Sequence, residues 1–322
     1  MIKFSSLISK LTDSQRILIV GHIMPDGDDI SSVVSLTLGL QQLGKSVLGA
    51  IDDKIPPEYL VFPGVKDLID YEKFLDLKFS PDVVVVLDCS SPDRVGRFVK
   101  ILPEHTIVVI DHHATNGFFG DINWVDSTYA ATAQMVFHLN KVLGIEYNEE
   151  LATINFVGLA TDSGFFRYSN TTSNLLKDAA ELVEMGAKPH FVASTILENK
   201  TLNQFLLLSK MIDKIKVEKG LAYSVLTFED YLSCGCTDQD SSGFVSEIRS
   251  LKNVEVAVLV MEYPKNRVHV SLRSKNYVDV SKIAATLGGG GHARAAGCSF
   301  ENADPWQVLK EVLTLVREAM GG

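Results

Sequence analysis

One carboxylate and two imidazoles, those of Asp111, His112 and His113, directly follow the apolar run T-I-V-V-I. Clusters of such side chains bind divalent metal ions or transfer protons during catalysis. The run contains the β-branched residues I-V-V-I in succession, which favour a buried strand. Since an open α/β sheet binds ligands at the carboxyl ends of its strands, we expect the three side chains to lie at a ligand-binding edge.

Two other apolar runs end in the same kinds of residue. R-I-L-I-V-G ends in His22, after which a short loop carries Asp26 and Asp28, and V-V-V-V-L ends in Asp88. A single residue of this kind is often structural, as a helix cap or a satisfied core group. Three such endings on one edge of a parallel sheet would instead gather acids and imidazoles in one place, and that cluster needs cations.

The surroundings of two further acids give them different roles. Asp162 ends an apolar helix expected over 151–160, just before a glycine turn, and is a fourth acidic candidate for the cluster. Asp29 stands at the start of a helix expected over 30–43. We expect Asp29 to be solvated and to interact with the helix dipole, so that asparagine in its place changes turnover only a few-fold.

A tract of four glycines at 288–291 is followed by His292 and Arg294. Consecutive glycines expose backbone N–H groups and let an anion approach closely, while the histidine and arginine add donors. A flexible linker is the alternative, but the tract runs into A-R-A-A-G, which we expect to be helical, and a strand ending in Arg273 precedes it. The pattern predicts a site for a phosphate or a carboxylate.

Composition limits the classes of protein to consider. A chain of 322 residues, 46% hydrophobic and 22% charged, is long enough for two cores. Its net charge of −10 argues against a protein that wraps duplex nucleic acid, which needs a basic surface. Four scattered cysteines do not form a disulfide framework and favour a reducing cytoplasm. No apolar run is long enough to cross a bilayer.

The order of the expected elements predicts an α/β protein. A parallel sheet with helices on both faces is expected because helices alternate with apolar strands, at 16–22, 45–51, 81–88 and 106–113. From about residue 203 the pattern changes to a hairpin over 214–228 and further strands, which predicts a smaller α/β domain. We assign 1–186 to a catalytic domain, 187–203 to a helical linker and 204–322 to a substrate-binding domain, with the active site in the cleft between the domains.

Five motifs resemble those of the DHH phosphoesterase family, in the same order. They are H-I-M-P-D-G-D at 22–28, V-V-L-D at 85–88, D-H-H at 111–113, G-L-A-T-D-S-G at 158–164 and G-G-G-G-H-A-R-A-A-G at 288–297. The last is similar to the signature of the DHH-associated C-terminal domain. The layout resembles the oligoribonuclease and phosphoadenosine phosphatase group and the stand-alone cyclic di-AMP phosphodiesterases. Asp29 and Ser31 depart from the small residue and the glycine usual in the family.

The resemblance implies two metal ions that share one carboxylate. One ion would be held by His22, Asp26 and Asp88, and the other by Asp28, Asp88, His112 and Asp162. Such donors suit Mn²⁺, with Mg²⁺ or Co²⁺ as alternatives. Two ions of this kind can activate water for in-line attack on phosphorus.

The resemblance also implies roles for residues that do not bind metal. Asp111 would orient an imidazole, and His113 would contact the scissile phosphate or assist the leaving oxygen. The second domain would hold the rest of the nucleotide through Arg273, Gly289, Gly290, Gly291, His292 and Arg294.

These features favour a two-metal phosphodiesterase that cleaves very short nucleotides to nucleoside 5′-monophosphates. The expected substrates are linear dinucleotides such as pApA, cyclic di-AMP and short oligoribonucleotides, with 3′-phosphoadenosine 5′-phosphate as a further one. Neither duplex nucleic acid nor a membrane is an expected partner, and a homodimer is left open. The alternatives are an inorganic pyrophosphatase or exopolyphosphatase, whose cleft would be richer in lysine and arginine, and a catalytically silent nucleotide-binding module. The intact metal motifs disfavour aminoacyl-tRNA editing.

Overall fold

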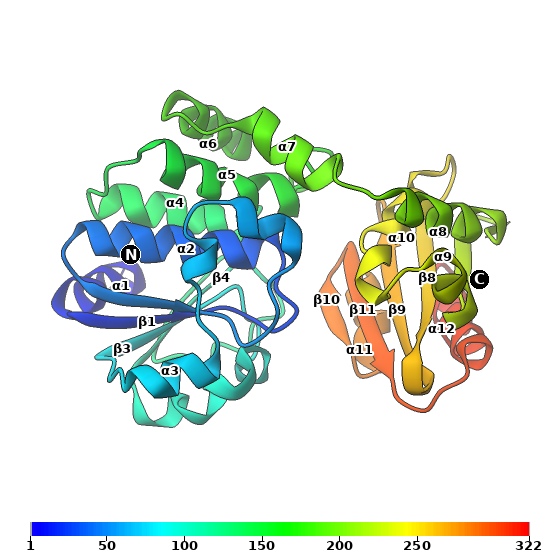
Figure 1. The fold of residues 1–322 in the computed structure, drawn as a ribbon, viewed down its shortest axis with the longest axis horizontal. Coiled ribbons are helices and arrows are strands. Elements are labelled where there is room, and N and C mark those ends of the chain that lie inside the picture. The colour runs from blue at the N-terminus through cyan, green and yellow to red at the C-terminus, as the bar shows by residue number, and fades with distance from the viewer. Residues whose placement is uncertain (1, 322) are drawn as a thin grey trace. The chain divides into compact units, whose positions relative to one another are not determined.

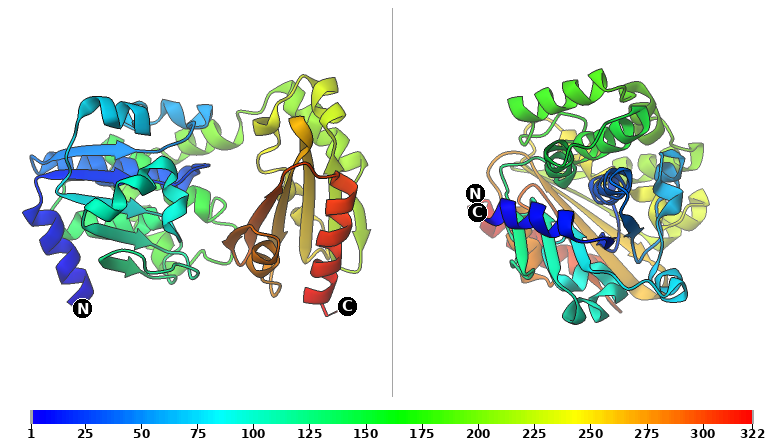
Figure 2. Two further views of the ribbon diagram at one scale, coloured as in Figure 1. Left: turned by 90° about the horizontal axis from the view of Figure 1, so that it is seen from below. Right: turned by 90° about the vertical axis from the view of Figure 1, so that its left-hand side faces the viewer.

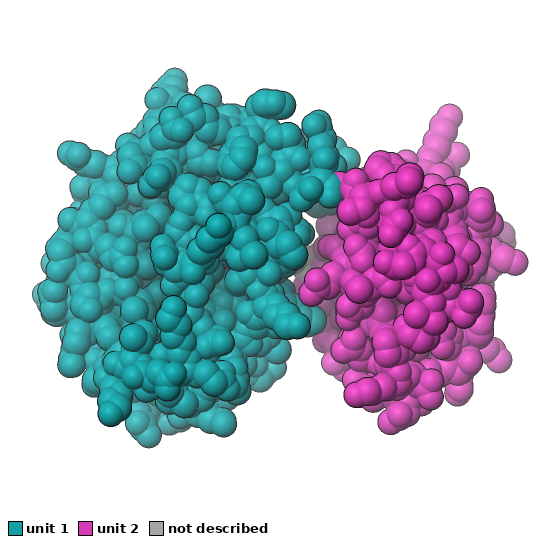
Figure 3. Space-filling model, viewed as in Figure 1, with its two compact units in different colours: residues 1–199 teal, residues 200–322 magenta. Residues whose placement is uncertain are grey.

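The computed structural model describes residues 2–321 and divides the chain into two compact units, the first ending at Asn199 and the second beginning at Lys200 (Figures 1 and 3). Each unit has its own sheet and its own hydrophobic cores. The predicted α/β fold with two sheets is confirmed. None of the helices among the described residues is long and apolar enough to cross a membrane.

The first unit is built on a five-stranded sheet whose strands are all parallel, in the order β2-β1-β3-β4-β5. The central strands are almost entirely buried runs of branched apolar residues, as a sheet covered on both faces requires. Parallel pairing brings the carboxyl ends of these strands to one edge. The bounds are β1 Arg16–Val20, β2 Ser46–Ala50, β3 Val83–Leu87, β4 Ile107–Asp111 and β5 Ile122–Val125.

Strand β5 is not expected from the sequence. Its residues, I-N-W-V, are all only partly buried, because β5 lies at the edge of the sheet and contains no long apolar run. Tertiary contacts hold it instead, since the Trp124 ring packs edge-to-face against Phe4 and Tyr129.

Helices cover both faces of this sheet (Figures 1 and 2). On one face α1, α2 and α4 pack through residues such as Leu11, Leu36 and Val136, and on the other α3 and the 3₁₀ helix η3 pack through Phe74 and Phe98. Helix α5 packs against α2 and α4, and α6 and α7 pack against α5. The bounds are α1 Ile2–Asp13, α2 Gly27–Gln42, α3 Tyr71–Leu77, η3 Pro92–Lys100, α4 Thr132–Val142, α5 Glu149–Asp162, α6 Ser173–Glu184 and α7 Pro189–Leu197.

Helix α2 begins at Gly27 rather than at residue 30, the start expected from the apolar pattern. The Asp26 carboxylate caps it by accepting hydrogen bonds from the backbone N–H groups of Asp28 and Asp29, at 3.0 and 3.1 Å. Both of these acids therefore lie in the first helical turn, where they are buried.

The second unit contains a six-stranded mixed sheet in the order β10-β11-β9-β8-β7-β6, in which only β7 and β8 pair in parallel. Helices α8, α9 and α10 pack on one face, and α11 and α12 pack on the other, where Figure 2 shows α12 in red. The bounds are α8 Leu202–Asp213, β6 Lys216–Glu218, β7 Leu221–Leu226, α9 Phe228–Cys234, α10 Phe244–Ser250, β8 Val256–Tyr263, β9 Arg267–Ser274, α11 Val280–Thr286, β10 Gly290–His292, β11 Ala295–Phe300 and α12 Pro305–Ala319.

The expectation of a helix after the glycine tract is wrong, because A-A-G at 295–297 begins strand β11. Antiparallel pairing with β10 and β9 on its two sides overrides the high helix propensity of alanine. The glycines permit this close pairing. A Cβ on Gly289 would lie 2.1 Å from the carbonyl oxygen of Gly297, and one on Gly291 would lie 2.5 Å from that of Ala295.

Candidate active site

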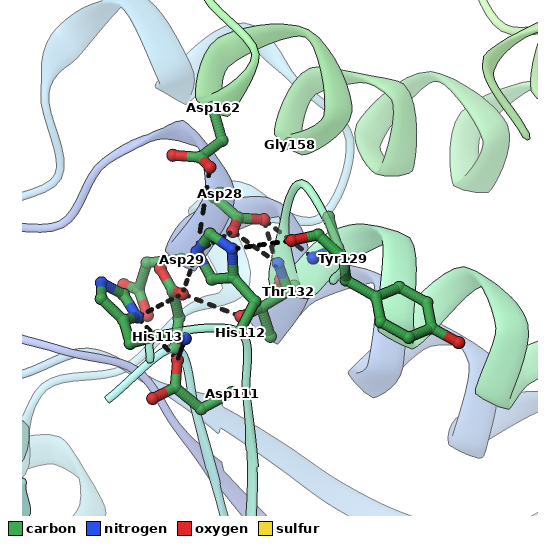
Figure 4. A network of polar contacts seen from close by, with 12 residues as sticks. Asp28, Asp29, Asp111, His112, His113, Tyr129, Thr132, Gly158 and Asp162 are labelled. Carbon is green, nitrogen blue, oxygen red and sulfur yellow. Dashed lines mark hydrogen bonds and ion pairs between the residues drawn. The ribbon is translucent and has the colours of Figure 1, made fainter. Parts of the chain in front are cut away.

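The ends of three strands bring acids and imidazoles together at the carboxyl edge of the first sheet (Figure 4). His22 lies just beyond β1, Asp88 directly follows β3, and Asp111 is the last residue of β4. Asp162 reaches the same place from the end of α5, where its Oδ2 atom lies 3.8 Å from His112 Nε2.

The acids and imidazoles form three overlapping groups, each able to hold a divalent ion. Within a group, one donor atom from every residue lies within 4.8 Å of the others. Carboxylate and imidazole donors suit Mn²⁺ and Mg²⁺, so this donor set fits the metal ions expected from the sequence. The groups are His22 with Asp26 and Asp88, Asp28 with His112 and Asp162, and Asp88 with His112 and His113.

Asp88 faces histidines through both of its carboxylate oxygens. Oδ2 lies 3.6 Å from His22 Nε2, and Oδ1 lies 3.5 Å from His112 Nε2. The Asp88 backbone is left-handed, with φ 55°, a conformation that aspartate tolerates better than most residues. The Thr132 hydroxyl donates to Oδ1 at 2.8 Å. Burial alone would raise the pKa of Asp88, but the hydrogen bond from His22 and the charges of His113 and His112 hold it well below its usual range.

Asp28 is held by the first turn of α4. Its carboxylate accepts hydrogen bonds from the backbone N–H groups of Thr132 and Ala133 at 2.7 and 2.8 Å. The N-cap of α4 is Ala131, which has no capping side chain, so Asp28 satisfies the helix N-terminus instead. Burial and the charge of Asp88 raise the pKa of Asp28 well above its usual range. A bound cation would offset the cost of ionising this buried acid.

His113 is held by Asp111, and Asp111 is held by Asn116. His113 Nδ1 lies 2.7 Å from Asp111 Oδ1, and since an ionised carboxylate only accepts, Nδ1 donates and the acid–base chemistry falls to Nε2. Asn116 Nδ2 donates to Asp111 Oδ2 at 2.7 Å and to the carbonyl oxygen of Cys89 at 2.9 Å. Burial lowers the pKa of His113, but the hydrogen bond to Asp111 and the charge of Asp88 raise it to about 9.

Thr132 and Asn116 are site residues that the sequence analysis does not identify. Threonine at a helix start and asparagine in a loop are common for local reasons, as a cap and as a turn residue. Only the fold shows that Thr132 contacts Asp88 and that Asn116 contacts Asp111.

The expectation that Asp29 is solvated is wrong, since its side chain is fully buried. Oδ1 accepts a hydrogen bond from the His22 backbone N–H at 3.0 Å, and Oδ2 has no hydrogen-bond partner among residues 2–321. Burial together with the charges of Asp88 and Asp26 raises the pKa of Asp29 to about 7. Gly21 carries a sequence signal of this packing, because a Cβ there would lie 2.3 Å from Asp29 Oδ1.

The predicted substrate-binding residues lie in the second unit. Arg273 on β9 pairs with Ala295, the residue that follows Arg294. Arg294 Nη1 donates to the carbonyl oxygen of Val278 at 2.7 Å, and Arg273 Nη1 donates to that of Leu272 at 3.0 Å. These hydrogen bonds to backbone carbonyls fix the positions of the two guanidinium groups. Gly289, Gly290 and Gly291 run beside β11, and the side chain of His292 lies outside the part of the chain that the structure describes.

Two family models match this chain. One, described as the N-terminal domain of the DHH family, matches residues 16–159, and the other, described as the DHHA1 domain, matches residues 218–322.

Two named relatives match over nearly the whole length. The chain is 36% identical to the bifunctional oligoribonuclease and PAP phosphatase NrnA of Thermus thermophilus over 308 residues, which is 94% of this chain and 90% of the relative. It is 26% identical to the protein of the same name from Bacillus subtilis, over 98% of this chain and 99% of that one.

Solved structures share the fold. An exopolyphosphatase-related protein from Bacteroides fragilis is similar with a TM-score of 0.88 at 25% identity, covering 99% of this chain and 96% of that one. RecJ from Thermus thermophilus, solved in complex with Mn²⁺, is similar in fold with a TM-score of 0.55 at 14% identity, over 98% of this chain and 54% of RecJ.

Proposed function

This chain belongs to the DHH family and is a phosphoesterase, and we propose that it uses two metal ions to hydrolyse short nucleotides to nucleoside 5′-monophosphates. The observation that carries the proposal is the position of Asp88, whose two oxygens face His22 and His112 in two different metal-binding groups. A carboxylate placed in this way could serve both metal ions of a two-metal phosphoesterase.

Each residue of the site has a proposed task. His22, Asp26 and Asp88 hold one ion, and Asp28, Asp88, His112 and Asp162 hold the other. Bound Mn²⁺, with Mg²⁺ or Co²⁺ as alternatives, supplies charge neutralisation at the phosphate and activation of the attacking water. His113, oriented by Asp111, holds a proton at Nε2 for the leaving oxygen. Thr132 fixes the Asp88 carboxylate, so that its two oxygens keep their directions.

The proposed substrates are pApA and other linear dinucleotides, short oligoribonucleotides, cyclic di-AMP and 3′-phosphoadenosine 5′-phosphate. Relatives named oligoribonuclease and PAP phosphatase support this range. The net charge of −10 supports short ligands, because an extended strand needs a basic track along its backbone. In our proposal Arg273, Arg294 and the glycine tract bind the part of the nucleotide that is not cleaved. We also propose a cytoplasmic location.

A second candidate function is the hydrolysis of inorganic polyphosphate, which the likeness to an exopolyphosphatase-related protein favours. The same metal centre would serve both reactions, so the substrate must decide between them. A ligand without a base or a ribose would leave the second unit only phosphate charge to recognise.

A product time course with Mn²⁺ tests the proposal. The panel comprises pApA, cyclic di-AMP, oligoribonucleotides of increasing length, 3′-phosphoadenosine 5′-phosphate and polyphosphate. We expect the fastest turnover on dinucleotides and a decline as chains lengthen. Preference for polyphosphate over every nucleotide would support the second candidate, and no turnover of any nucleotide would contradict the first.

A further inference from the structure

His269 lies on a face of the second sheet that the helices cover only in part. Helices α8, α9 and α10 cover this face over β8, where Leu259 and Met261 are buried. On the neighbouring strand β9, every second side chain from Arg267 to Arg273 belongs to the same face, and none of these four is buried. The residues of β11 that pair with them on this face are not buried either. A ligand can therefore reach the sheet along β9 and β11.

Two polar side chains stand at the ends of a stretch of small residues on this face. Arg273 and His269 are four positions apart, which is about 13 Å along an extended strand and comparable to the length of one nucleotide. Between them lie Ser271 and its partner on β11, Gly297. We call this surface the open strip, and it consists of Arg273, Ser271 and His269 on β9 with Ala295, Gly297 and Ser299 on β11.

The imidazole of His269 leans into the open strip. Its Nδ1 atom lies 2.8 Å from the hydroxyl oxygen of Ser299, the residue opposite it on β11. The other edge of the ring lies over Gly297, because a Cβ there would lie 3.3 Å from both Nε2 and Cε1. Since Gly297 pairs with Ser271, one position closer to Arg273 on this face, the Nε2 edge is directed toward the middle of the strip.

The two ends of the open strip differ in charge. Arg273 carries a positive charge at every pH of interest. Burial, followed by the charges of Arg273 and Arg267, lowers the pKa of His269 below 6.5, so its ring is neutral at pH 7. The Ser299 hydroxyl can donate to Nδ1 or accept from it, which lets Nε2 donate or accept in turn. The arginine thus suits a phosphate, and the histidine suits a neutral polar group.

We propose that the open strip holds one nucleoside of the substrate, with its base hydrogen-bonded to Nε2 of His269 and the attached phosphate bound by Arg273. A phosphate at the arginine leaves the base one nucleotide length away, over residues too small to obstruct it. Inorganic phosphates have no base to contact the histidine. This inference rests on the proposed function, in which Arg273 binds the uncleaved part of the nucleotide, and adds a residue that selects nucleotides over polyphosphate.

Two substitutions separate the hydrogen bond from the bulk of the ring. His269→Phe keeps a ring but removes Nε2, whereas His269→Gln keeps a polar group near the position of that atom. For pApA with saturating Mn²⁺, we expect the KM of His269→Phe to rise about 5- to 10-fold with kcat changed much less, and that of His269→Gln to stay within about two-fold of the original. A dinucleotide analogue lacking both bases should show the same KM with all three proteins.

The matched control is His190→Phe, which makes the same exchange at an exposed histidine in the first turn of α7, in the first unit. It should leave the KM for pApA unchanged.

Binding of the expected product gives a readout besides turnover. The Cε1–H NMR signal of His269 can be identified by its loss in His269→Gln. In the full chain this signal should shift when adenosine 5′-monophosphate is added, and much less when ribose 5-phosphate is added, because ribose 5-phosphate has no base.

The outcomes distinguish this inference from the proposed function. If the original chain turns over dinucleotides and His269→Phe has the same KM, the contact with the base is overturned. An equal rise of KM on the analogue without bases, or an equal NMR shift with ribose 5-phosphate, would overturn it as well. A shift specific to adenosine 5′-monophosphate in a chain that hydrolyses no nucleotide would support the contact and contradict the proposed reaction.

Discussion

The carboxyl edge of the first sheet and the β9–β11 end of the second sheet differ in the partners that surround their charged side chains. At the first, Asp28 and Asp88 are buried beside His112, and the ion pairs of these two acids are with histidines. At the second, Arg294 is hydrogen-bonded to the carbonyl oxygen of Val278, in a segment whose N–H groups are bound by Glu255.

The charged side chains of the first region therefore lower the stability of the fold, whereas those of the second region do not. Buried acids that face one another are costly until cations arrive, whereas a charged group with hydrogen-bond partners is stable as it stands. The first region should respond strongly to metal ions and weakly to substrate length, and the second should show the reverse.

The largest expected effect comes from removing the shared carboxylate. Asp88→Asn should lower kcat with Mn²⁺ by about a thousand-fold or more, the loss expected when several kcal/mol of charge stabilisation disappear. The amide keeps the shape of the side chain, so the second sheet should be unaffected. Steady-state kinetics and metal titration would measure this, and near-normal turnover at saturating Mn²⁺ would reject the bridging role.

The two histidines of the D-H-H motif should separate metal binding from chemistry. His112→Ala should lose metal, because its Nε2 atom faces the three carboxylates of Asp28, Asp88 and Asp162. His113→Ala should keep nearly all of its metal but lose about 100-fold or more in kcat, as expected for a group that transfers a proton in the transition state. Elemental analysis of both variants provides the test. Equal metal loss would contradict the separate roles.

In the second region, Arg294→Ala should act on substrate binding and leave metal content unchanged. We expect kcat/KM for dinucleotides to fall by an amount equivalent to about 1.5–3 kcal/mol, the value of a charge-assisted contact. Lysine at this position should recover only part of the loss, because a point charge does not reproduce the guanidinium fork. The measurement is kinetics on dinucleotides and longer strands. Unchanged dinucleotide kinetics would show that Arg294 has only a packing role and does not bind the substrate.

We expect Glu255→Gln to have the smallest effect on activity. It should clearly change how the stability of the second unit depends on pH. Burial raises the pKa of Glu255, but hydrogen bonds from the N–H groups of Val278, Tyr277 and Asn276 outweigh it and lower the pKa below 4.5. The folded state thus prefers the charged form, so this stabilisation is present above pH 4.5 and is lost as the pH falls through the lowered pKa.

At pH 7 we expect the substitution to cost the second unit about 1–3 kcal/mol in free energy of unfolding. At a pH below the lowered pKa of Glu255, the original chain and Glu255→Gln should converge. Hydrogen exchange of β8 and β9 at the two pH values would measure this, with the exchange of β3 and β4 as the internal control. A difference that persists unchanged at low pH would show that the Glu255 charge is not what holds the segment.

The sequence predicts the parallel sheet and the strand ends because both depend on apolar runs that can be read locally. It does not predict β5, since I-N-W-V is held by Phe4 and Tyr129 from distant parts of the chain. It predicts the wrong structure for A-A-G at 295–297, where pairing with two strands outweighs helix propensity.

The candidate site shows the same limit. His22, Asp88 and His112 can be identified because they directly follow or closely follow strands. Asp29 cannot be placed correctly from its position at a helix start, because its burial depends on room made by Gly21 and on the acids that surround it. The supporting contacts of Thr132 and Asn116 join segments that are far apart or irregular, and no local pattern encodes them.

The start of α4 has a consequence for how this enzyme can change over evolutionary time. Asp28 satisfies the N-terminus of α4, and Asp26 caps α2, so replacing either acid would destabilise a helix as well as remove a proposed metal ligand. Among the contacts described, the carboxylate of Asp162 does not cap a helix. Drift toward a different metal preference should therefore enter through Asp162, while Asp26 and Asp28 stay fixed by the architecture that they support.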